Sequence, residues 1–253
     1  MQADVQERWE EEDPQDHVLH MWEPLPFSTP RGYDYTRRRA DKTLGTFLLR
    51  TVVVLVLSVY HYIMFGFRIK GRENLKALEG RGAVTVCNHS HTLDCTMVSM
   101  ALYPRRTYTV TLESNFRIPF VRHLMRWLDG VPLAEEPHCL GEMMRAMGDA
   151  ARRGCYVHIY PEAILLPYCG HIRHFKPGAF RLAAENGLPV VPMVLRQVPP
   201  RGLFRLYKRK PCLELVLLPA VECPQRGSVR QKAQALSEAC FAAMDRCMKG
   251  DFA

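Results

Sequence analysis

Long hydrophobic runs are scarce in this 253-residue chain. The mean hydropathy is −0.16, and the segment 43–67 is the only strongly apolar stretch. A membrane protein with many spans is therefore excluded, because each span needs about 20 consecutive apolar residues. A disordered polymer is excluded as well, since 47% of the residues are hydrophobic and disordered chains contain few hydrophobic residues. The length allows one large domain or two small ones.

Closely paired cysteines are absent too. The nine cysteines form no CxxC motif, whereas secreted disulfide frameworks place an even number of cysteines at tighter spacing in shorter chains. The first 20 residues are acidic, whereas a secretory signal peptide is basic and then apolar. We therefore expect a reducing compartment, with the protein on the cytoplasmic side of any membrane that it binds.

Acidic residues are scarce outside the N-terminal region. The chain holds 34 Lys and Arg residues against 26 Asp and Glu residues, a formal net charge of +8. The first 30 residues carry −7, which leaves +15 for the other 223. Such a surplus suits an anionic partner, which can be nucleic acid, an anionic membrane surface or a polyphosphate cofactor. The charge alone does not separate these partners from simple solubility.

The apolar stretch follows an N-terminal region of unusual composition. Residues 1–40 are acidic, then proline-bearing, then basic, and we expect a poorly ordered tail there. The segment 43–67 is long enough to cross a hydrocarbon core, but Arg50 and His61 interrupt it and basic residues flank both of its ends. A spanning helix usually has more basic residues on its cytoplasmic side. We therefore expect residues 41–69 to form a helix inserted in one leaflet, with a buried core helix as the alternative.

From residue 83 onward, short β-branched or aromatic runs alternate with helical patterns. Strands are expected at residues 83–87, 107–111, 156–160, 190–195 and 213–218, and helices at 140–153, 180–185 and 228–248. This alternation predicts a single α/β domain over residues 70–253, with a mostly parallel sheet flanked by helices. The ligand site of such a sheet lies at the carboxyl ends of its strands.

A histidine and an aspartate follow the first of these strands. His89 and Asp94 are five positions apart at a strand-to-helix junction, so the carboxylate can accept from one ring nitrogen and raise the basicity of the other. That other nitrogen can then take a proton from an alcohol. Two alternatives remain open from these residues alone. One is a metal site built from His89, His91 and Asp94, and the other is a helix-capping aspartate beside an ordinary loop histidine.

Further motifs occur in a fixed order between about residue 70 and residue 195. They are Asn88-His89 with Asp94, Tyr160-Pro161-Glu162, Phe175-Lys176-Pro177-Gly178-Ala179-Phe180 and Leu188-Pro189-Val190-Val191-Pro192. On these motifs the chain resembles the glycerophospholipid acyltransferases, the family of bacterial lysophosphatidate acyltransferases. The resemblance covers about half of the chain and includes four blocks in the order that the family has.

The resemblance implies transfer of a fatty acyl group from a thioester, acyl-CoA or acyl carrier protein, to the hydroxyl of a lysophospholipid or a glycerophosphate-type acceptor. His89 would be the general base, and Asp94 would orient and polarise it. The hydroxyl would attack the thioester directly, and the chain has no GxSxG motif for a nucleophilic serine. The implied partners are a membrane lipid, the acyl donor and an anionic membrane surface, with no cofactor, no metal and no nucleic acid.

The chain also departs from the family pattern. The family's arginines in G-x-F-I-x-R and P-E-G-T-R are missing, and Ala163 replaces the glycine of the second motif. By similarity to a family variant with P-E-A, we expect Arg173 and Lys176 to bind the acceptor's anion instead. Asn88, Glu162 and Tyr168 complete the expected substrate-binding residues.

The missing arginines keep a second hypothesis open, in which the protein is a catalytically weak scaffold that binds lipid or acyl carrier protein. A nucleic-acid-binding role lacks any recognition motif in the sequence. For the surplus charge we therefore expect an anionic membrane and a phosphorylated acyl donor. The basic residues that flank the apolar segment are Arg37, Arg38, Arg39, Lys42, Arg68, Lys70 and Arg72.

Overall fold

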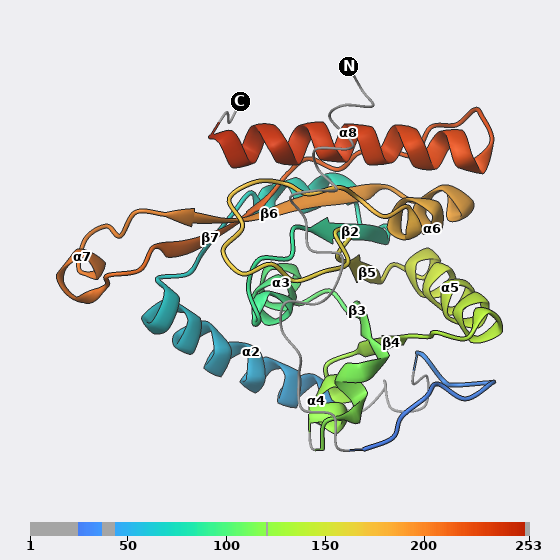
Figure 1. Ribbon diagram of the computed structural model, residues 1–253, viewed down its shortest axis with the longest axis horizontal. Helices are drawn as coiled ribbons and strands as arrows, with labels where there is room; N and C mark the ends of the chain where they lie inside the picture. Colours follow the sequence, from blue (N-terminus) through green and yellow to red (C-terminus); the bar gives the residue numbers. More distant parts are fainter. Residues whose placement is uncertain (1–24, 37–43, 120, 251–253) are drawn as a thin grey trace.

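The computed structural model describes residues 25–36, 44–119 and 121–250, in which helices lie on both faces of one sheet (Figure 1). The strands run in the order β1-β7-β6-β2-β5-β3-β4. They are β1 (Arg68–Lys70), β2 (Ala83–Cys87), β3 (Thr107–Leu112), β4 (Gly130–Leu133), β5 (Tyr156–Ile159), β6 (Val190–Val198) and β7 (Cys212–Leu217). The helices are α2 (Leu44–Phe65), α3 (Asp94–Leu102), α4 (Val121–Trp127), α5 (Pro137–Arg152), α6 (Gly178–Asn186), α7 (Phe204–Tyr207) and α8 (Val229–Lys249), with 3-10 turns η1 (Arg72–Leu78) and η2 (Glu113–Arg117).

The centre of the sheet is parallel. Strand β2 pairs in parallel with β5 and β6, and β3 pairs in parallel with β5 and β4. Strands β6 and β7 are antiparallel, and β1 is parallel to β7. The two strands at this edge of the sheet, β1 and β7, therefore run opposite to the other five. Mixed sheets of this kind are common in α/β folds. The expected α/β fold with a mostly parallel sheet is confirmed.

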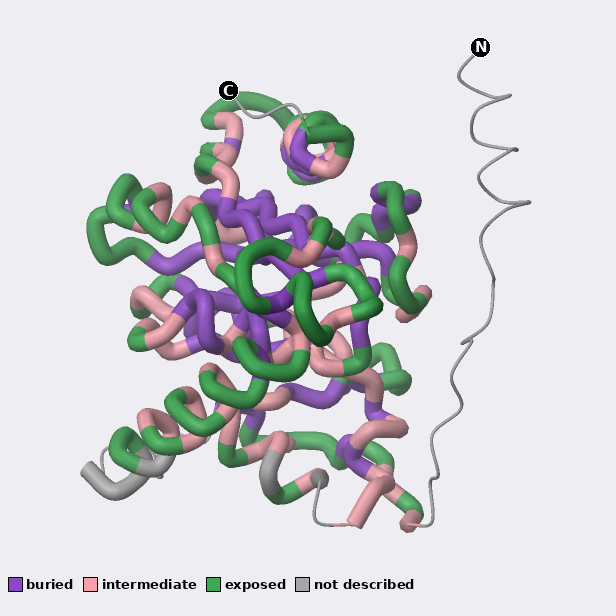
Figure 2. The backbone as a smooth tube through the Cα atoms, turned by 90° about the vertical axis from the view of Figure 1, so that its left-hand side faces the viewer, coloured by how far each residue is buried: buried purple, intermediate pink, exposed green. Residues whose placement is uncertain are grey.

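Strand β2 lies in the middle of the sheet and is buried along its whole length. Its side chains alternate between the two faces, as the pleat of a strand requires. Val84 and Val86 join the cluster under α5, α6 and α8, whereas Ala83 and Cys87 join the cluster under α3. Both faces are therefore covered, which explains a continuous apolar run in place of a polar alternation. Figure 2 shows the buried backbone concentrated in this central layer.

The five expected strands all form, but β1 and β4 are absent from the prediction. The sequence of β1 is Arg-Ile-Lys and β4 contains Pro132, so neither carries the apolar run by which the other strands are recognised. Backbone pairing holds these short segments in the sheet, β1 on β7 and β4 on β3.

The helix ends follow local sequence signals. Ser228 caps α8 by accepting a hydrogen bond from the Gln231 backbone N–H, and the Gln231 side chain accepts from the Ser228 backbone N–H. This reciprocal capping box satisfies two of the donors that a helix start leaves unpaired. Helix α6 ends at Gly187, whose φ of 62° is the left-handed conformation that glycine adopts at low cost.

Arg50 and His61, the two residues that interrupt the apolar sequence of α2, both contact the rest of the protein. Arg50 forms an ion pair of 3.1 Å with Asp129, and the fully buried His61 forms a hydrogen bond of 2.7 Å with Thr96. Because eleven residues make three helical turns, Arg50 and His61 lie on the same face. The exposed apolar residues are Phe47, Leu48, Val52, Leu55, Val56, Val59, Tyr60, Tyr62, Ile63 and Met64. Within residues 25–36, 44–119 and 121–250, we find no helix that is long and apolar enough to cross a membrane.

The N-terminal boundaries differ from the expected ones. Residues 68–70 form a strand, so the helix expected over 41–69 ends at Phe65. The part of the tail that the structure describes, residues 25–36, packs on the domain through the buried Tyr35, whose hydroxyl donates to the Cys139 carbonyl. The rest of the expected tail, and Lys42 with the arginines at 37–39, lie outside the described residues.

Two of the basic residues expected to face lipid headgroups also have partners within the protein. Lys70 forms an ion pair of 3.1 Å with the buried Glu214. Arg72 donates from Nε to the Ala101 carbonyl at 2.8 Å, at the end of α3. Both side chains are nevertheless exposed, so the expectation that they lie near lipid headgroups stays a prediction.

Candidate active site

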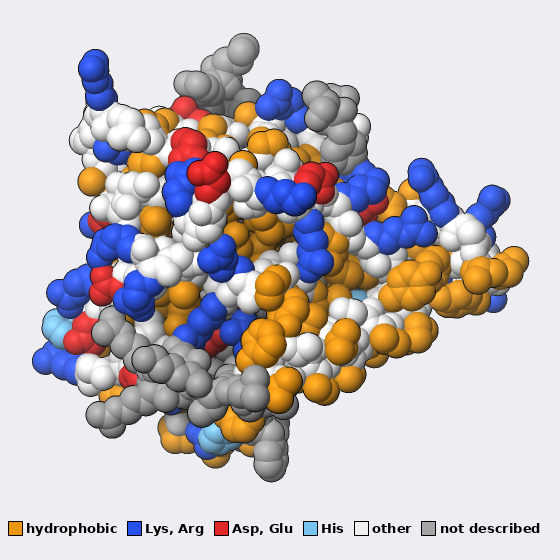
Figure 3. Space-filling view, turned by 180° about the vertical axis from the view of Figure 1, so that it is seen from behind, with side chains coloured by type: hydrophobic (Ala, Val, Ile, Leu, Met, Phe, Trp, Pro, Cys, Tyr) orange, Lys and Arg blue, Asp and Glu red, His pale blue; other side chains and the backbone are white. Residues whose placement is uncertain are grey.

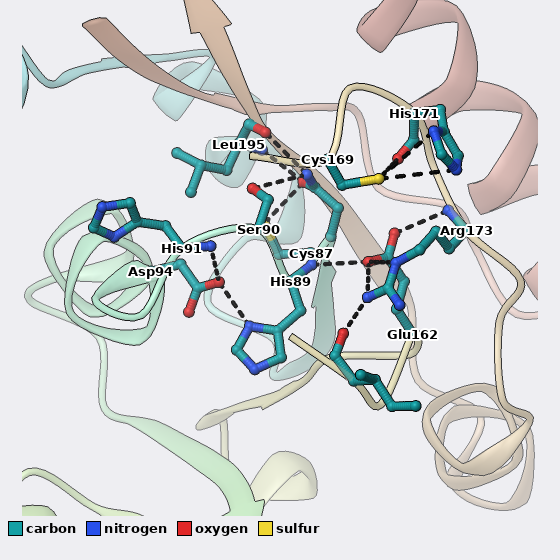
Figure 4. A network of polar contacts seen from close by, with 12 residues as sticks. Cys87, His89, Ser90, His91, Asp94, Glu162, Cys169, His171, Arg173 and Leu195 are labelled. Carbon is teal, nitrogen blue, oxygen red and sulfur yellow. Dashed lines mark hydrogen bonds and ion pairs between the residues drawn. The ribbon is translucent and has the colours of Figure 1, made fainter. Parts of the chain in front are cut away.

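The histidine and aspartate singled out in the sequence meet at the carboxyl end of β2. His89 follows this strand, Asp94 begins α3, and His89 Nδ1 lies 2.8 Å from Asp94 Oδ2 (Figure 4). The Asp94 side chain is 1% exposed and that of His89 is 22% exposed. The carboxylate also accepts the His91 backbone N–H at 3.4 Å, and the dipole of α3 favours a negative charge at this position.

This geometry fixes the roles of the two ring nitrogens. With Asp94 ionised, Nδ1 of His89 carries the proton that is donated to the carboxylate, so Nε2 retains a lone pair. His91 is oriented differently: its Nδ1 accepts the Leu93 backbone N–H at 3.1 Å, and Figure 4 shows its ring turned away from that of His89. The two histidines therefore do not converge on one metal position with Asp94.

Asn88 joins the ends of two strands. Its side-chain amide donates to the Leu195 carbonyl at 2.9 Å and accepts from the Leu195 backbone N–H at 2.8 Å. The residue is buried, so the asparagine of the first block is occupied in tying β2 to β6. This differs from the expected substrate contact and gives Asn88 a structural role beside His89.

Glu162 and Arg173 form a buried ion pair behind His89. Glu162 follows β5, and its Oε2 accepts from Arg173 Nη2 at 2.9 Å and from the His89 backbone N–H at 3.1 Å. Arg173 also donates to the Ile164 carbonyl, and its side chain is 2% exposed. The expectation that Arg173 binds an acceptor's anion is therefore not supported, because its guanidinium is buried and held by protein oxygens. The pair instead connects the second block to the backbone of the first.

Tyr168 and Lys176 lie on the loop between β5 and α6. Both are exposed. The Tyr168 ring stands edge-on to that of His91, with centroids 5.9 Å apart, and the Tyr168 backbone N–H donates to the Ser90 carbonyl at 2.9 Å. Tyr168 is thus beside the candidate site. For Lys176, the backbone N–H donates to the Pro161 carbonyl at 2.7 Å, which fixes the loop while leaving the side chain exposed.

Two residues of the site were not predicted. The Tyr160 ring stacks on the His89 imidazole, with centroids 4.1 Å apart and an interplanar angle of 19°. The His158 ring stands edge-on to that of Tyr160, with centroids 4.5 Å apart. Its Nδ1 forms a hydrogen bond of 3.0 Å with the Thr85 hydroxyl. The signal available in the sequence was the period of two in the strand expected over residues 156–160, which puts residues 158 and 160 on one face.

The His158 ring and the Tyr160 hydroxyl are buried. Burial lowers the pKa of His158 to about 4, so the ring is neutral at pH 7. Burial, followed by the charge of Asp94, raises the pKa of the Tyr160 hydroxyl. Among the described residues, neither the Tyr160 hydroxyl nor Asp94 Oδ1 has a hydrogen-bond partner, although both atoms are buried.

The apolar helix reaches the same site. Phe65, the last residue of α2, stands edge-on to His91 with ring centroids 4.8 Å apart. The exposed apolar face of α2 therefore ends beside the histidine block.

Fold and site together define an α/β protein with a histidine–carboxylate pair at the carboxyl end of a central parallel strand. Residues 66–196 match the profile of the family described as Acyltransferase, so the chain belongs to that family. The 1-acyl-sn-glycerol-3-phosphate acyltransferase of Escherichia coli is 25% identical over 193 residues, which cover 72% of this chain and 74% of that protein. A chloroplastic 1-acyl-sn-glycerol-3-phosphate acyltransferase of Arabidopsis thaliana is 29% identical over 146 residues, 57% of this chain and 40% of the relative.

A solved structure shares the fold. The 1-acyl-sn-glycerophosphate acyltransferase from Thermotoga maritima superposes with a TM-score of 0.57 at 18% identity, covering 85% of this chain and 88% of that chain. The chain spans about two fifths of the length of the chloroplastic relatives that it matches. The resemblance to the acyltransferase family stated from the sequence motifs is confirmed.

Proposed function

We propose that the protein transfers a fatty acyl group from a thioester donor to the free hydroxyl of lysophosphatidate. The observation that carries this proposal is the 2.8 Å contact between His89 and Asp94 in the family's first block, with Asp94 buried and His89 reachable from solvent. The names of the bacterial and plant relatives support the acceptor, since they are acyltransferases of 1-acyl-sn-glycerol-3-phosphate. Acyl-CoA and acyl carrier protein both provide the required thioester.

His89 acts as the general base in this proposal. Its Nε2 accepts the proton of the acceptor hydroxyl while that oxygen attacks the thioester carbonyl carbon. The carbon–sulfur bond then breaks, and the proton passes from His89 to the departing thiolate. Asp94 stabilises the imidazolium that exists between these two transfers. No bond forms between the acyl group and the protein, so the reaction has no acyl-enzyme intermediate.

Glu162 and Arg173 serve as positioning residues. Glu162 holds the His89 backbone N–H through the same oxygen that binds the guanidinium. Since both side chains are buried, solvent does not compete for these bonds, and the loop that carries His89 is held against β5. Positioning of this kind counts in catalysis because displacements of about 1 Å can cost about a hundredfold in rate.

The acceptor enters from a lipid surface in contact with α2. The exposed face of α2 is apolar, and its C-terminal end contacts the histidine block through Phe65 and His91. A lysolipid with its acyl chain in the leaflet can then present its hydroxyl at His89, while a water-soluble thioester arrives from the cytoplasmic side.

A panel of acceptors tests this function. Purified protein is incubated with radiolabelled acyl-CoA, or with labelled acyl carrier protein, and with lysophosphatidate, other lysophospholipids or glycerol 3-phosphate. We expect labelled phosphatidate from lysophosphatidate as the fastest product. Folded protein that labels none of the acceptors with either donor would overturn the proposal and favour a lipid- or carrier-binding scaffold.

A further inference from the structure

We propose that the tip of the hairpin between β6 and β7, residues 199–211, is a second membrane contact that binds anionic phospholipid headgroups. This hairpin tip contains the short helix α7 and extends beyond the body of the sheet (Figure 1). This inference rests on the proposed function in one respect, which is that the apolar face of α2 lies on a membrane.

The hairpin tip exposes large apolar side chains. Leu203 is 78% exposed, Leu206 is 83% exposed and Tyr207 is 59% exposed. Their neighbour Phe204 is buried, so the short helix has one face against the protein and the other in solvent. Clusters of exposed apolar side chains rimmed by polar residues are typical of protein or membrane contacts.

The charge of the hairpin tip selects the partner. Residues 199–211 contain no acidic residue and five basic ones, Arg201, Arg205, Lys208, Arg209 and Lys210. Figure 3 shows Lys and Arg side chains standing over the apolar end of this projection. Basic residues next to inserted apolar side chains match an anionic bilayer surface, where each cation adds attraction to the headgroups. A second copy of the same tip would instead meet like charge.

The hairpin tip and α2 form one continuous surface. The Tyr207 hydroxyl donates to the Ile63 carbonyl at 3.2 Å, and Lys208 Nζ donates to the Met64 carbonyl at 2.6 Å. The Tyr62 and Phe204 rings pack edge to face with centroids 5.2 Å apart. Figure 3 shows the apolar side chains continuing from the tip along the helix. The two elements can therefore lie on the same plane of lipid.

The position of the cations gives the hairpin tip a separate role from α2. Arg50 is the one residue with a full charge in α2 and it pairs with Asp129, so the apolar face of α2 itself carries no charge for a headgroup. The hairpin tip adds four exposed basic residues at the end of this surface, Arg201, Arg205, Arg209 and Lys210. We infer that it sets the preference for anionic lipid and orients the protein on the bilayer.

Vesicle binding by the full chain tests the inference. One variant is Arg205→Glu/Arg209→Glu, and its matched control is Arg226→Glu/Arg230→Glu, which has the same net charge and changes exposed residues next to and in the first turn of α8. Binding is measured by co-sedimentation with vesicles of phosphatidylcholine alone and of phosphatidylcholine mixed equally with phosphatidylglycerol. We expect the hairpin variant to lose about tenfold or more in binding to the anionic vesicles, whereas the control keeps the affinity of the unmodified protein. Equal binding by the two variants would overturn the inference.

The apolar residues are tested in the same way. Leu203→Ser/Leu206→Ser should weaken binding to both kinds of vesicle, whereas Val229→Ser, which changes an exposed valine on α8, should not. A change of oligomeric mass by light scattering, with vesicle binding intact, would identify a second copy of the chain as the occupant and refute the inference. Acyl transfer in detergent micelles should be the same in all these variants. If the unmodified protein transfers no acyl group but the hairpin variants still lose vesicle binding, the proposed function fails and this inference stands.

Discussion

Removing the guanidinium of Arg173 should destabilise the protein far more than removing an exposed arginine. The side chains of Arg173 and Glu162 are 2% and 1% exposed, and their oxygen and nitrogen atoms lie 2.9 Å apart. Breaking a buried pair leaves an unpaired charge in the interior and costs about 3–5 kcal/mol. We expect Arg173→Met to lower the free energy of unfolding by this amount. For a protein of this size, that corresponds to a fall in Tm of about 6–20 °C.

The matched control is Arg181→Met. Arg181 forms an ion pair of 2.7 Å with Glu185 on α6, but the arginine side chain is 68% exposed. An exposed pair contributes about 1 kcal/mol or less. Urea unfolding followed by circular dichroism measures both variants, together with Glu162→Gln and the double variant Glu162→Gln/Arg173→Met.

The double variant separates the two interpretations of Arg173. If the pair is structural, removing both charges restores part of the stability, and the double-mutant cycle gives a coupling energy of about 0.5–3 kcal/mol or more. Unchanged stability in Arg173→Met, with a raised KM for lysophosphatidate alone, would refute this reasoning and return Arg173 to the role of an anion ligand.

Three further predictions concern the buried rings and the loop. Burial lowers the pKa values of His61 and His158 to about 4, so below about pH 6.5 the unfolded state binds more protons than the folded state. The free energy of unfolding should therefore be highest above that pH and fall by about 3 kcal/mol per histidine as the pH drops to about 4. Urea unfolding at pH 7 and at pH 4.5 should show a smaller loss for His61→Gln, and an identical loss would contradict the assignment. Tyr160→Phe keeps the ring on His89 and should retain transfer, whereas Tyr160→Leu should lower kcat with little change in KM. Equal kcat in both variants would remove the positioning role. Ala163 has a φ of 62°, so Ala163→Gly should raise the free energy of unfolding by about 1 kcal/mol in thermal or urea unfolding, and a loss of stability would contradict the strain.

The sequence predicts those parts of the fold that local patterns determine. Strand β2 is a run of five buried residues, and α8 begins at a serine followed three residues later by a glutamine, so both are visible in a short window. The spacing of His89 and Asp94 allowed their pairing, and the resemblance to the acyltransferase family favoured it over a metal site and over a helix-capping aspartate. The spacing of Arg50 and His61 indicates that they share a face of α2, but not which protein groups meet them.

The rest depends on contacts between residues far apart in the chain. Tyr160 stacks on His89 across 71 positions, and that contact exists only because β2 and β5 are neighbours in the sheet. Arg173 was expected to bind the acceptor's anion by similarity to a family variant with P-E-A, in which it replaces the family's missing arginines. Its actual position depends on Glu162, a partner that follows β5 and that also binds the backbone beside β2. The order of strands decides both outcomes, and strand order is not a local property.

The role of His89 as general base is the central claim, and the initial rate of acyl transfer to lysophosphatidate tests it most directly. The comparison is between the unmodified protein, His89→Ala, and the control His171→Ala, which removes an exposed loop histidine. Circular dichroism checks that each variant is folded. We expect His89→Ala to lose about 10²–10⁴-fold in rate, while His171→Ala stays within about twofold of the unmodified protein. Folded His89→Ala protein that transfers acyl groups at the rate of the control would contradict the account.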